Sequence, residues 1–469
     1  MTHRILTILG LCLGLAALPQ PALSGAAAAS AQPEAHALAG RWEGSITVGG
    51  RPIRVIFRID ETGAAVMDSP DQGATGLPVQ SVTLDGDRAV FLVPAIGGRF
   101  EGVRSADGRT LTGALHQGAA QMPMVLTRTA EAATIAGPAR PQTPRAPFPY
   151  ASEDVSFDNP AAPGVTLAGT LTLPEGQGPF PAVVLISGSG PQDRDEALMG
   201  HRPFLIWADA LSRQGIAVLR YDDRGVGAST GSFQAATGAD LASDAVAALA
   251  WLATRPEVDP ARIGLIGHSE GGTLAPYVVQ QGGEAAWIVM LAGPTVTGGE
   301  IISEQQRRLA VALGATAEQV EQSNGVQREV MQAVADNAGD RAASIAAVTA
   351  ILVAAGQPEA AARSSAAGVS SDWYRWFVTH DPEASLRELD VPLLAVFGGL
   401  DLQVPADQNG DALRAIRPDA EIVVLPGLNH LFQTAETGLP DEYQTIEETV
   451  APVALDTVIT WIRARAGLD

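Results

Sequence analysis

The hydrophobic pattern of the first part of the chain is that of short β-strands. Between about residues 38 and 128, short apolar stretches follow one another without a helical period. Turn residues such as Asp107-Gly108 separate them, and residues 68–72 also have the composition of a turn. We therefore expect a small all-β domain, a barrel or a sandwich, over residues 37–130. Its clearest strands are predicted at residues 45–48, 53–59, 89–93 and 124–127.

A proline-rich stretch follows the β region. Residues 137–149 read Gly-Pro-Ala-Arg-Pro-Gln-Thr-Pro-Arg-Ala-Pro-Phe-Pro, a composition typical of a stiff and extended linker. We expect the linker to occupy residues 131–150 and a second domain to occupy residues 151–469.

Beyond the linker, predicted strands and helices alternate. Residues 165–173 alternate apolar and polar positions, which suits an antiparallel sheet edge, whereas residues 182–186 are continuously apolar, as in a buried parallel strand. This order indicates the α/β class, with a mostly parallel sheet flanked by helices. The remaining strands are predicted at 216–220, 263–266, 287–291, 392–397 and 421–425, and the helices at 204–213, 240–254, 269–281 and from 452 to about 465.

One segment interrupts this alternation. Residues 295–389 show no strand pattern and are rich in Ala, Gln, Glu and Arg, with helical periods at 304–313, 317–335 and 344–355. Inserted between two sheet strands, such a segment is expected to form a helical cap over one end of the sheet. An aromatic cluster in the cap either packs its core or lines an acyl pocket. The cluster consists of Trp373, Tyr374, Trp376 and Phe377.

The N-terminal residues have the pattern of a secretory signal. Arg4 precedes an apolar run over residues 5–18, and a small-residue tract follows, so we expect a signal peptide over residues 1–31. The apolar run is shorter than the roughly 20 residues of a membrane span, although an uncleaved anchor is the alternative. Cys12, the only cysteine, lies inside the run. The sequence therefore predicts export to the periplasm or the medium, with no disulfide in the mature protein.

Charge and composition exclude several kinds of chemistry. The formal net charge of -22 argues against nucleic acid or an anionic membrane as a partner. All 30 basic residues are arginines, which excludes a P-loop lysine, a Schiff-base lysine and a Ser–Lys dyad. With Cys12 in the signal, no thiolate metal ligand remains. We expect no cofactor and no metal site.

The strongest chemical signal is a glycine-bracketed serine. Gly267-His268-Ser269-Glu270-Gly271 fits G-x-S-x-G, between the strand predicted at 263–266 and the helix predicted at 269–281. This motif forms a sharp strand-to-helix turn that exposes a serine hydroxyl above a sheet. The sequence therefore predicts Ser269 as a nucleophile, with the side chain of His268 pointing away from it.

A serine nucleophile needs a base and an acid that orients the base. His430 follows the last predicted sheet strand, whereas the chain's other histidines lie outside that position. Asp401 follows the strand predicted at 392–397, so the order Ser269, Asp401, His430 matches that of hydrolases with this turn. Asp407 and Asp411 are alternatives for the acid, although a first-turn position on the next helix also favours acids.

Two backbone N–H groups are expected to bind the oxyanion. One belongs to Glu270, the residue after the nucleophile, and the other to the glycine-containing loop over residues 187–195. We assign Ser189 as the second donor, with Gly188 or Gly190 also possible.

Three motifs together resemble a known family. They are Gly188-Ser-Gly-Pro-Gln-Asp-Arg-Asp195, Leu219-Arg-Tyr-Asp-Asp-Arg-Gly-Val-Gly-Ala-Ser-Thr230 and Gly267-His-Ser-Glu-Gly-Gly272. The region from about residue 149 onward resembles the α/β-hydrolases, and more narrowly the bacterial carboxylesterases of the EstD type. The resemblance implies an additional N-terminal β domain. Ser187 departs from it, since many relatives have histidine there, which leaves the bracing of this loop open.

Three functions are compatible with these residues. The favoured one is an exported hydrolase of small carboxylic esters that forms an acyl-serine intermediate. The alternative is a serine aminopeptidase-like peptidase of the same fold, for which Glu300, Glu304 or Glu318 in the cap would bind the substrate amine. The third is a non-catalytic exported binding protein with a relic hydrolase domain.

Overall fold

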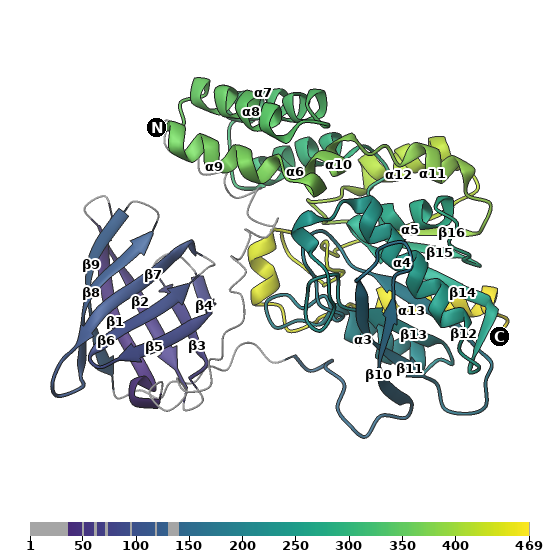
Figure 1. The fold of residues 1–469 in the computed structure, drawn as a ribbon, viewed down its shortest axis with the longest axis horizontal. Coiled ribbons are helices and arrows are strands. Elements are labelled where there is room, and N and C mark those ends of the chain that lie inside the picture. Colours follow the sequence, from purple (N-terminus) through teal and green to yellow (C-terminus); the bar gives the residue numbers. More distant parts are fainter. Residues whose placement is uncertain are drawn as a thin grey trace. The chain divides into compact units, whose positions relative to one another are not determined.

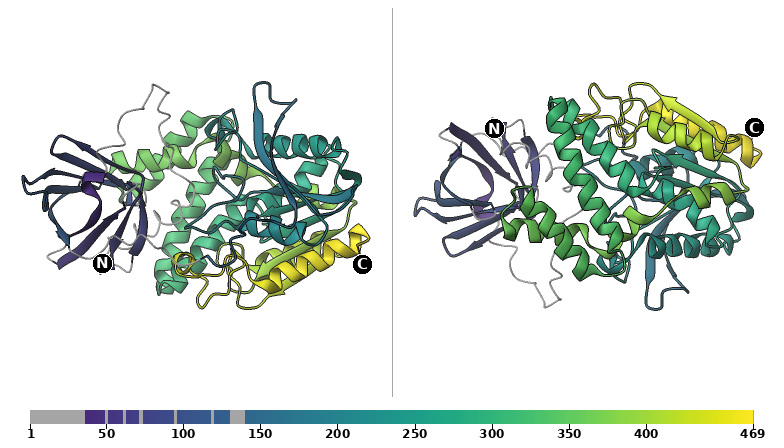
Figure 2. Two further views of the ribbon diagram at one scale, coloured as in Figure 1. Left: turned by 90° about the horizontal axis from the view of Figure 1, so that it is seen from below. Right: turned by 90° about the horizontal axis from the view of Figure 1, so that it is seen from above.

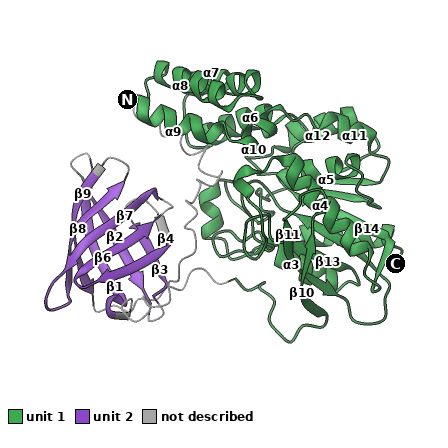
Figure 3. Cartoon of the chain, in the orientation of Figure 1, with its two compact units in different colours: residues 1–20, 140–469 green, residues 21–139 purple. Residues whose placement is uncertain are grey.

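The computed structural model describes residues 36–48, 51–60, 63–70, 74–93, 96–117, 120–129 and 140–468. These residues form two compact units, a smaller one that precedes residue 140 and a larger one from there on (Figure 3). The expected signal peptide over residues 1–31 and the first part of the expected linker lie outside the described residues.

The smaller unit is one antiparallel sheet of nine strands. The strands are β1 (Gly40–Val48), β2 (Arg51–Ile59), β3 (Ala65–Ser69), β4 (Ala74–Val79), β5 (Ser81–Asp85), β6 (Arg88–Val93), β7 (Gly98–Arg104), β8 (Thr110–Gln117) and β9 (Ala120–Thr129), after a short 3₁₀ helix η1 (His36–Leu38). Their order in the sheet is β4-β3-β2-β1-β9-β8-β7-β6-β5. The sheet curls around a single apolar core, so the unit is a barrel rather than a sandwich (Figure 1).

The barrel core is aromatic at its centre. Trp42 and three phenylalanines, Phe57, Phe91 and Phe100, are completely buried. The rings of Phe57 and Phe91 meet edge to face with centroids 5.0 Å apart. The four strands predicted from the sequence lie within β1, β2, β6 and β9.

The prediction of a turn at residues 68–72 is wrong for the first two of these residues. Asp68 and Ser69 belong to β3, and Asp68 is only 7% exposed. Its carboxylate receives two hydrogen bonds of 2.9 Å from the guanidinium of Arg58 on the neighbouring β2. Asp and Ser are typical turn residues, so this stretch reads as a turn when its partners are unknown. The pairing of Asp68 with Arg58 is what allows the aspartate to lie inside a sheet.

The larger unit is built on a mixed sheet of eight strands. The strands are β10 (Ala151–Asp158), β11 (Thr166–Leu173), β12 (Phe180–Ile186), β13 (Ala217–Tyr221), β14 (Val258–His268), β15 (Ile288–Leu291), β16 (Leu393–Gly398) and β17 (Glu421–Leu425). Their order is β10-β11-β13-β12-β14-β15-β16-β17. The pairs β10–β11 and β11–β13 are antiparallel and the other pairs are parallel. This is the predicted α/β class.

The edge strand β10 was not predicted. Its sequence, ASEDVSFD, is polar and mostly exposed, because an edge strand with one open face buries few side chains. Residues 140–150 before it already belong to the larger unit. Arg140 and Gln142 donate hydrogen bonds of 2.6 Å to the backbone carbonyls of Ile446 and Val450.

Helices cover both faces of this sheet (Figure 1). They are α3 (Pro203–Ser212), α4 (Gly238–Ala253), α5 (Glu270–Gln280), α12 (Ala406–Ile416) and α13 (Pro452–Ala466), with short 3₁₀ helices η4 (Phe233–Ala235) and η5 (Pro440–Gln444). Helices α4 and α5 pack on one face and α3 and α13 on the other. Pro452 starts α13, as predicted. The central strands β12, β13, β15 and β16 are buried almost throughout, so the core lies between these layers.

The segment between β15 and β16 forms the expected helical cap. It consists of α6 (Gly298–Ala312), α7 (Ala317–Asp336), α8 (Arg341–Ala354), α9 (Glu359–Val369), α10 (Asp372–Thr379) and α11 (Glu383–Glu388), shown in green in Figures 1 and 2. Helices α7 to α10 share a small core of their own. Within the described residues, no helix is both long and apolar enough to span a membrane.

Helix α10 seats the cap on the sheet domain. Tyr374 and Phe377 are buried, which confirms packing as the role of these two members of the aromatic cluster. A Cβ atom on Gly238, at the start of α4, would lie 1.9 Å from the ring of Trp376, so the glycine leaves room for the indole. The side chain of Trp373 extends from α10 to the serine turn.

Candidate active site

Ser269 occupies the sharp turn between β14 and α5. Its backbone has φ 53° and ψ -121°, a conformation that costs a non-glycine residue energy and is typical of an exposed nucleophile. The Ser269 amide donates to the carbonyl of Leu291 on β15 at 2.8 Å, which holds the turn above the sheet. A Cβ on Gly267 would lie 2.0 Å from the carbonyl oxygen of Gly271, and a Cβ on Gly271 would lie 2.2 Å from that of Ile186. Both glycines of the motif are therefore required by close backbone approach.

The structure brings Ser269, His430 and Asp401 together. The Oγ of Ser269 lies 3.1 Å from Nε2 of His430, and Nδ1 of His430 lies 2.8 Å from Oδ2 of Asp401. The other oxygen of Asp401 accepts the backbone N–H groups of Gln403 and Val404, at 2.8 and 2.9 Å. Asp401 is 3% exposed, so its carboxylate is held in one orientation towards the imidazole.

The alternative acids lie elsewhere. Asp407 and Asp411 are on helix α12, where Asp407 pairs with Arg308 of the cap and Asp411 pairs with Arg414 at 2.7 Å. Of the three aspartates considered, the structure places only Asp401 against His430.

The glycine loop after β12 lies against the serine. A Cβ on Gly188 would be 3.2 Å from Cβ of Ser269, so the loop approaches Ser269 closely. The Gly188 amide itself donates to Oε1 of Glu196 at 2.7 Å and is therefore occupied. Within this loop, Ser189, the assigned donor, and Gly190, its alternative, remain as candidates for the second oxyanion donor. Glu270 begins α5, where backbone N–H groups have no partner within the helix.

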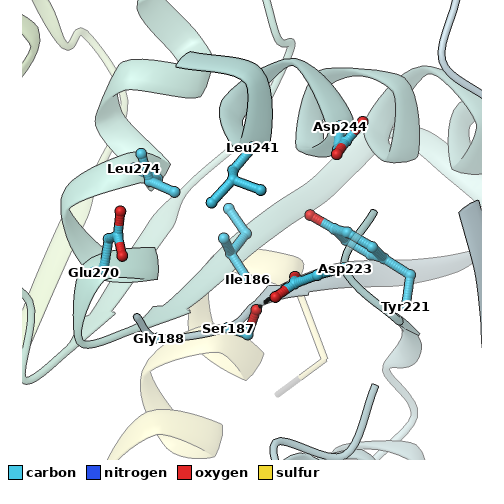
Figure 4. Close-up of a pocket in the computed structure, with 9 residues that line it drawn as sticks. All are labelled: Ile186, Ser187, Gly188, Tyr221, Asp223, Leu241, Asp244, Glu270 and Leu274. Carbon is cyan, nitrogen blue, oxygen red and sulfur yellow. Dashed lines mark hydrogen bonds between the residues drawn. The ribbon is translucent and has the colours of Figure 1, made fainter. Parts of the chain in front are cut away.

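Ser187 braces this loop. Its hydroxyl donates to Oδ1 of Asp223 at 3.0 Å (Figure 4). The Gln192 amide donates to Oδ2 of the same carboxylate at 2.8 Å. Burial raises the pKa of Asp223 to about 8. Asp223, Ser187 and Glu270 line a cavity of about 10 Å³ behind the loop, which has room for about one water molecule.

Glu196 and His268 were missed as members of the site. His268 does not bond to Ser269, as expected, but it lies beside the triad. Its Nδ1 is 2.8 Å from Oε1 of Glu196, its Nε2 is 3.0 Å from the backbone oxygen of His430, and the two imidazole centroids are 4.9 Å apart. Glu196 is 6% exposed and has φ 52°. A lone glutamate in a loop has no sequence signal for such a role.

The cap contacts the serine turn through Trp373. The indole Nε1 of Trp373 donates to Oε1 of Glu270 at 2.8 Å. Burial raises the pKa of Glu270 to about 7, and hydrogen bonds from the side chains of Trp373 and Ser189 oppose this increase. Glu270 thus contributes its amide to the expected oxyanion site and its side chain to the cap.

The chain was compared with known protein families. The model of the X-Pro dipeptidyl-peptidase (S15) family matches residues 163–431, more than half of the 469 residues. The chain belongs to this S15 family. The matched range includes Ser269, Asp401 and His430, and it excludes the N-terminal barrel.

Individual proteins are also similar to this S15 chain. Esterase EstD of Thermotoga maritima is 29% identical over 299 residues, which covers 63% of this chain and 65% of EstD, slightly less than two thirds of its length. An uncharacterised protein of Mycobacterium tuberculosis, Rv2307c, is 32% identical over 126 residues, which covers 27% of this chain and 41% of that protein. The predicted α/β-hydrolase resemblance of the EstD type, with an N-terminal β domain, is confirmed.

Solved structures with similarity to the chain include two proteins described as hydrolases. The α/β hydrolase GrgF from Penicillium sp. sh18 has a TM-score of 0.44 and 17% identity, and the match covers 68% of this chain and 99% of GrgF. The esterase Pf2001 of Pyrococcus furiosus has a TM-score of 0.41 and 17% identity, with 68% of this chain and 92% of the esterase covered.

Proposed function

We propose that this protein is a serine hydrolase that cleaves carboxylic esters through an acyl-serine intermediate. The observation that carries the proposal is the continuous chain of hydrogen bonds from Ser269 through His430 to Asp401, with distances of 3.1 and 2.8 Å. A serine hydroxyl becomes a nucleophile at neutral pH when a base accepts its proton in this geometry.

The proposed mechanism assigns one step to each group. His430 Nε2 accepts the proton of Ser269 as Oγ attacks the ester carbonyl, and Asp401 keeps the imidazole oriented and stabilises its positive charge. The N–H groups of Glu270 and Ser189 bind the oxyanion of the tetrahedral intermediate. His430 then gives the proton to the leaving alcohol, and a water molecule, activated by the same imidazole, releases the acid.

A peptidase that binds a free amino terminus is the second candidate, because the S15 family model is described as X-Pro dipeptidyl-peptidase. The acidic cap residues considered for such a site are engaged differently. Glu300 is part of the capping box of α6 with Thr297, and Glu304 pairs with Arg307 and Arg308. Glu318 is exposed on the first turn of α7. The contacts of Glu300 and Glu304 support the esterase over the peptidase, whereas Glu318 has no partner among the described residues that argues either way.

The proposed setting is outside the cytoplasm, based on the signal-like sequence of residues 1–31. Secretion of a reporter fused to these residues tests this part. The substrate class that fits is a small-molecule ester rather than a nucleic acid, given the net charge of -22.

The experiment measures two substrate series side by side. Purified protein is assayed on p-nitrophenyl esters of graded acyl length and on aminoacyl- and X-Pro-p-nitroanilides. We expect ester cleavage that falls at least about 10³-fold in Ser269→Ala. Faster turnover of the anilides than of the esters would show that the protein is a peptidase and would overturn the esterase proposal. Undiminished ester cleavage by Ser269→Ala would refute the acyl-serine mechanism for both candidates.

A further inference from the structure

A second carboxylate–histidine pair lies next to the triad. Oε1 of Glu196 accepts the amide of Gly188 at 2.7 Å and lies 2.8 Å from Nδ1 of His268. Nε2 of His268 lies 3.0 Å from the backbone oxygen of His430. Glu196 and His268 are each 6% exposed, so water does not compete freely for these bonds.

The partners of His268 determine its protons. A backbone carbonyl only accepts, so Nε2 must carry a proton to bond the oxygen of His430. An ionised Glu196 also only accepts, so Nδ1 carries a proton as well. Paired with an ionised Glu196, His268 is an imidazolium, and both of its hydrogen bonds are charge-assisted.

The pair connects three segments that are distant in sequence. Gly188 and Glu196 belong to the oxyanion loop after β12, His268 is the last residue of β14, and His430 lies in the loop after β17. Each segment carries one part of the proposed mechanism. The Glu196–His268 pair links the Gly188 backbone to the His430 backbone, so the two loops need no direct bond to each other.

We propose that Glu196 and His268 are positioning residues that fix the oxyanion loop and the loop of the catalytic base relative to the nucleophile. This role rests on the proposed function, since it positions the groups of that reaction. Neither side chain touches the ester. They keep the Gly188 backbone and the His430 backbone in the geometry that the reaction needs, so that neither loop has to move during the reaction.

The pair makes the arrangement dependent on pH. Burial acts to lower the pKa of His268, but the charge and hydrogen bond of Glu196, the His430 carbonyl and the charge of Asp401 together raise it above its ordinary value. The groups that face His268 are thus Glu196, His430 and Asp401. Because the pKa is raised, the bridge is intact below it and loses one hydrogen bond as the pH rises through it. Activity should therefore decline on the alkaline side.

The test uses Glu196→Gln, which keeps the shape of the side chain and removes its charge. We expect kcat on a p-nitrophenyl ester to fall roughly 10- to 100-fold, with KM changed by less than about twofold. The alkaline decline of kcat should begin at lower pH, since glutamine no longer raises the pKa of His268. His268→Gln should lower kcat similarly, and the double variant should be no slower than the slower single variant.

The controls separate this role from general stability. Glu175→Gln, at an exposed position between β11 and β12, should match the wild type. Titration of Ser269 with a fluorophosphonate counts competent sites. An unchanged kcat and alkaline decline in Glu196→Gln would overturn the inference, and so would a fall in activity that is fully explained by fewer titratable serines.

A measurement without turnover keeps the inference independent of the proposed function. In NMR spectra of the full chain, the ring of His268 should remain doubly protonated at neutral pH and should lose a proton at lower pH in Glu196→Gln. A neutral His268 ring in the wild type at neutral pH would overturn the bridge, whether or not the protein cleaves esters.

Discussion

Trp373 of the cap donates a hydrogen bond of 2.8 Å to Glu270, the residue that follows Ser269. The two residues are far apart in sequence and come from different parts of the larger unit, α10 and α5. Trp373 also stacks on Phe377, with ring centroids 5.3 Å apart, and Phe377 is part of the main core. The cap is therefore attached to the serine turn by a polar contact inside an apolar setting, where such a bond is strong.

Removing the donor of this contact should weaken the attachment of the cap. Trp373→Phe keeps an aromatic ring but removes the indole donor to Oε1 of Glu270, a loss that costs about 1–3 kcal/mol. We expect a lower thermal midpoint and a lower kcat/KM for long-chain esters. Trp251→Phe, a partly buried indole on α4 that stacks on Phe157, is the matched control. Equal losses in both variants would argue against a specific role of Trp373.

Asp401→Asn tests the acid of the triad. The amide keeps the size of the side chain, but its NH₂ group can be turned towards His430, which favours the wrong tautomer of the imidazole. We expect kcat to fall roughly 10³- to 10⁴-fold with little change in folding. Asp411→Asn on the exposed side of α12 should leave kcat unchanged. A large loss of kcat in Asp411→Asn, and not in Asp401→Asn, would assign the role of the acid to Asp411.

Asp223 should make stability depend on pH in an unusual direction. Burial raises its pKa from 3.8 to about 8, so the folded state binds a proton that the unfolded state has released at intermediate pH. Stability contributed by this group is therefore present below about pH 4 and is lost as the pH rises towards 8. Asp223→Asn mimics the neutral acid, and its amide can still bond both Ser187 and Gln192.

The measurement is urea unfolding of both proteins between pH 4 and 8. We expect Asp223→Asn to be tolerated at neutral pH and to lose less stability than the wild type over this range. Asp456→Asn, an exposed position on α13, serves as the control. A parallel pH dependence in the wild type and Asp223→Asn would show that Asp223 is ionised throughout.

Gly271 should not tolerate a side chain. A Cβ at this position would lie 2.2 Å from the backbone oxygen of Ile186, and backbone on a central strand cannot yield cheaply. We expect Gly271→Ala to destabilise the protein by about 1–3 kcal/mol and to abolish labelling of Ser269.

Gly325 provides the opposite case for comparison. It lies inside α7 with no heavy atom within 4 Å of a Cβ, so Gly325→Ala should stabilise the cap by about 1 kcal/mol through helix propensity. Both changes are read from thermal unfolding. Stabilisation by Gly271→Ala would contradict the close packing of the turn.

Local pattern predicted most elements of the larger unit. The continuous apolar stretches of β12, β15 and β16 are recognisable because strands buried on both faces need no polar positions. The periods of α7 and α8 are recognisable because one helical face is apolar. The polar edge strand β10 and the strand position of Asp68 were not predictable, because the first has little burial and the second depends on Arg58 from another strand.

For the site, the sequence by itself determined the residue types that the proposed chemistry needs and their order, Ser269, Asp401 and His430. Local backbone rules require glycines on both sides of such a serine and place polar residues directly after apolar strands. These features can therefore be recognised from the sequence alone. Only the tertiary structure decided which aspartate meets His430, that Gly188 donates to Glu196, and that Trp373 reaches Glu270. The Asp401–His430 and Trp373–Glu270 contacts join residues that are far apart in sequence, and the Gly188–Glu196 contact depends on how one loop folds back on itself. Only the folded domain brings the members of each pair together.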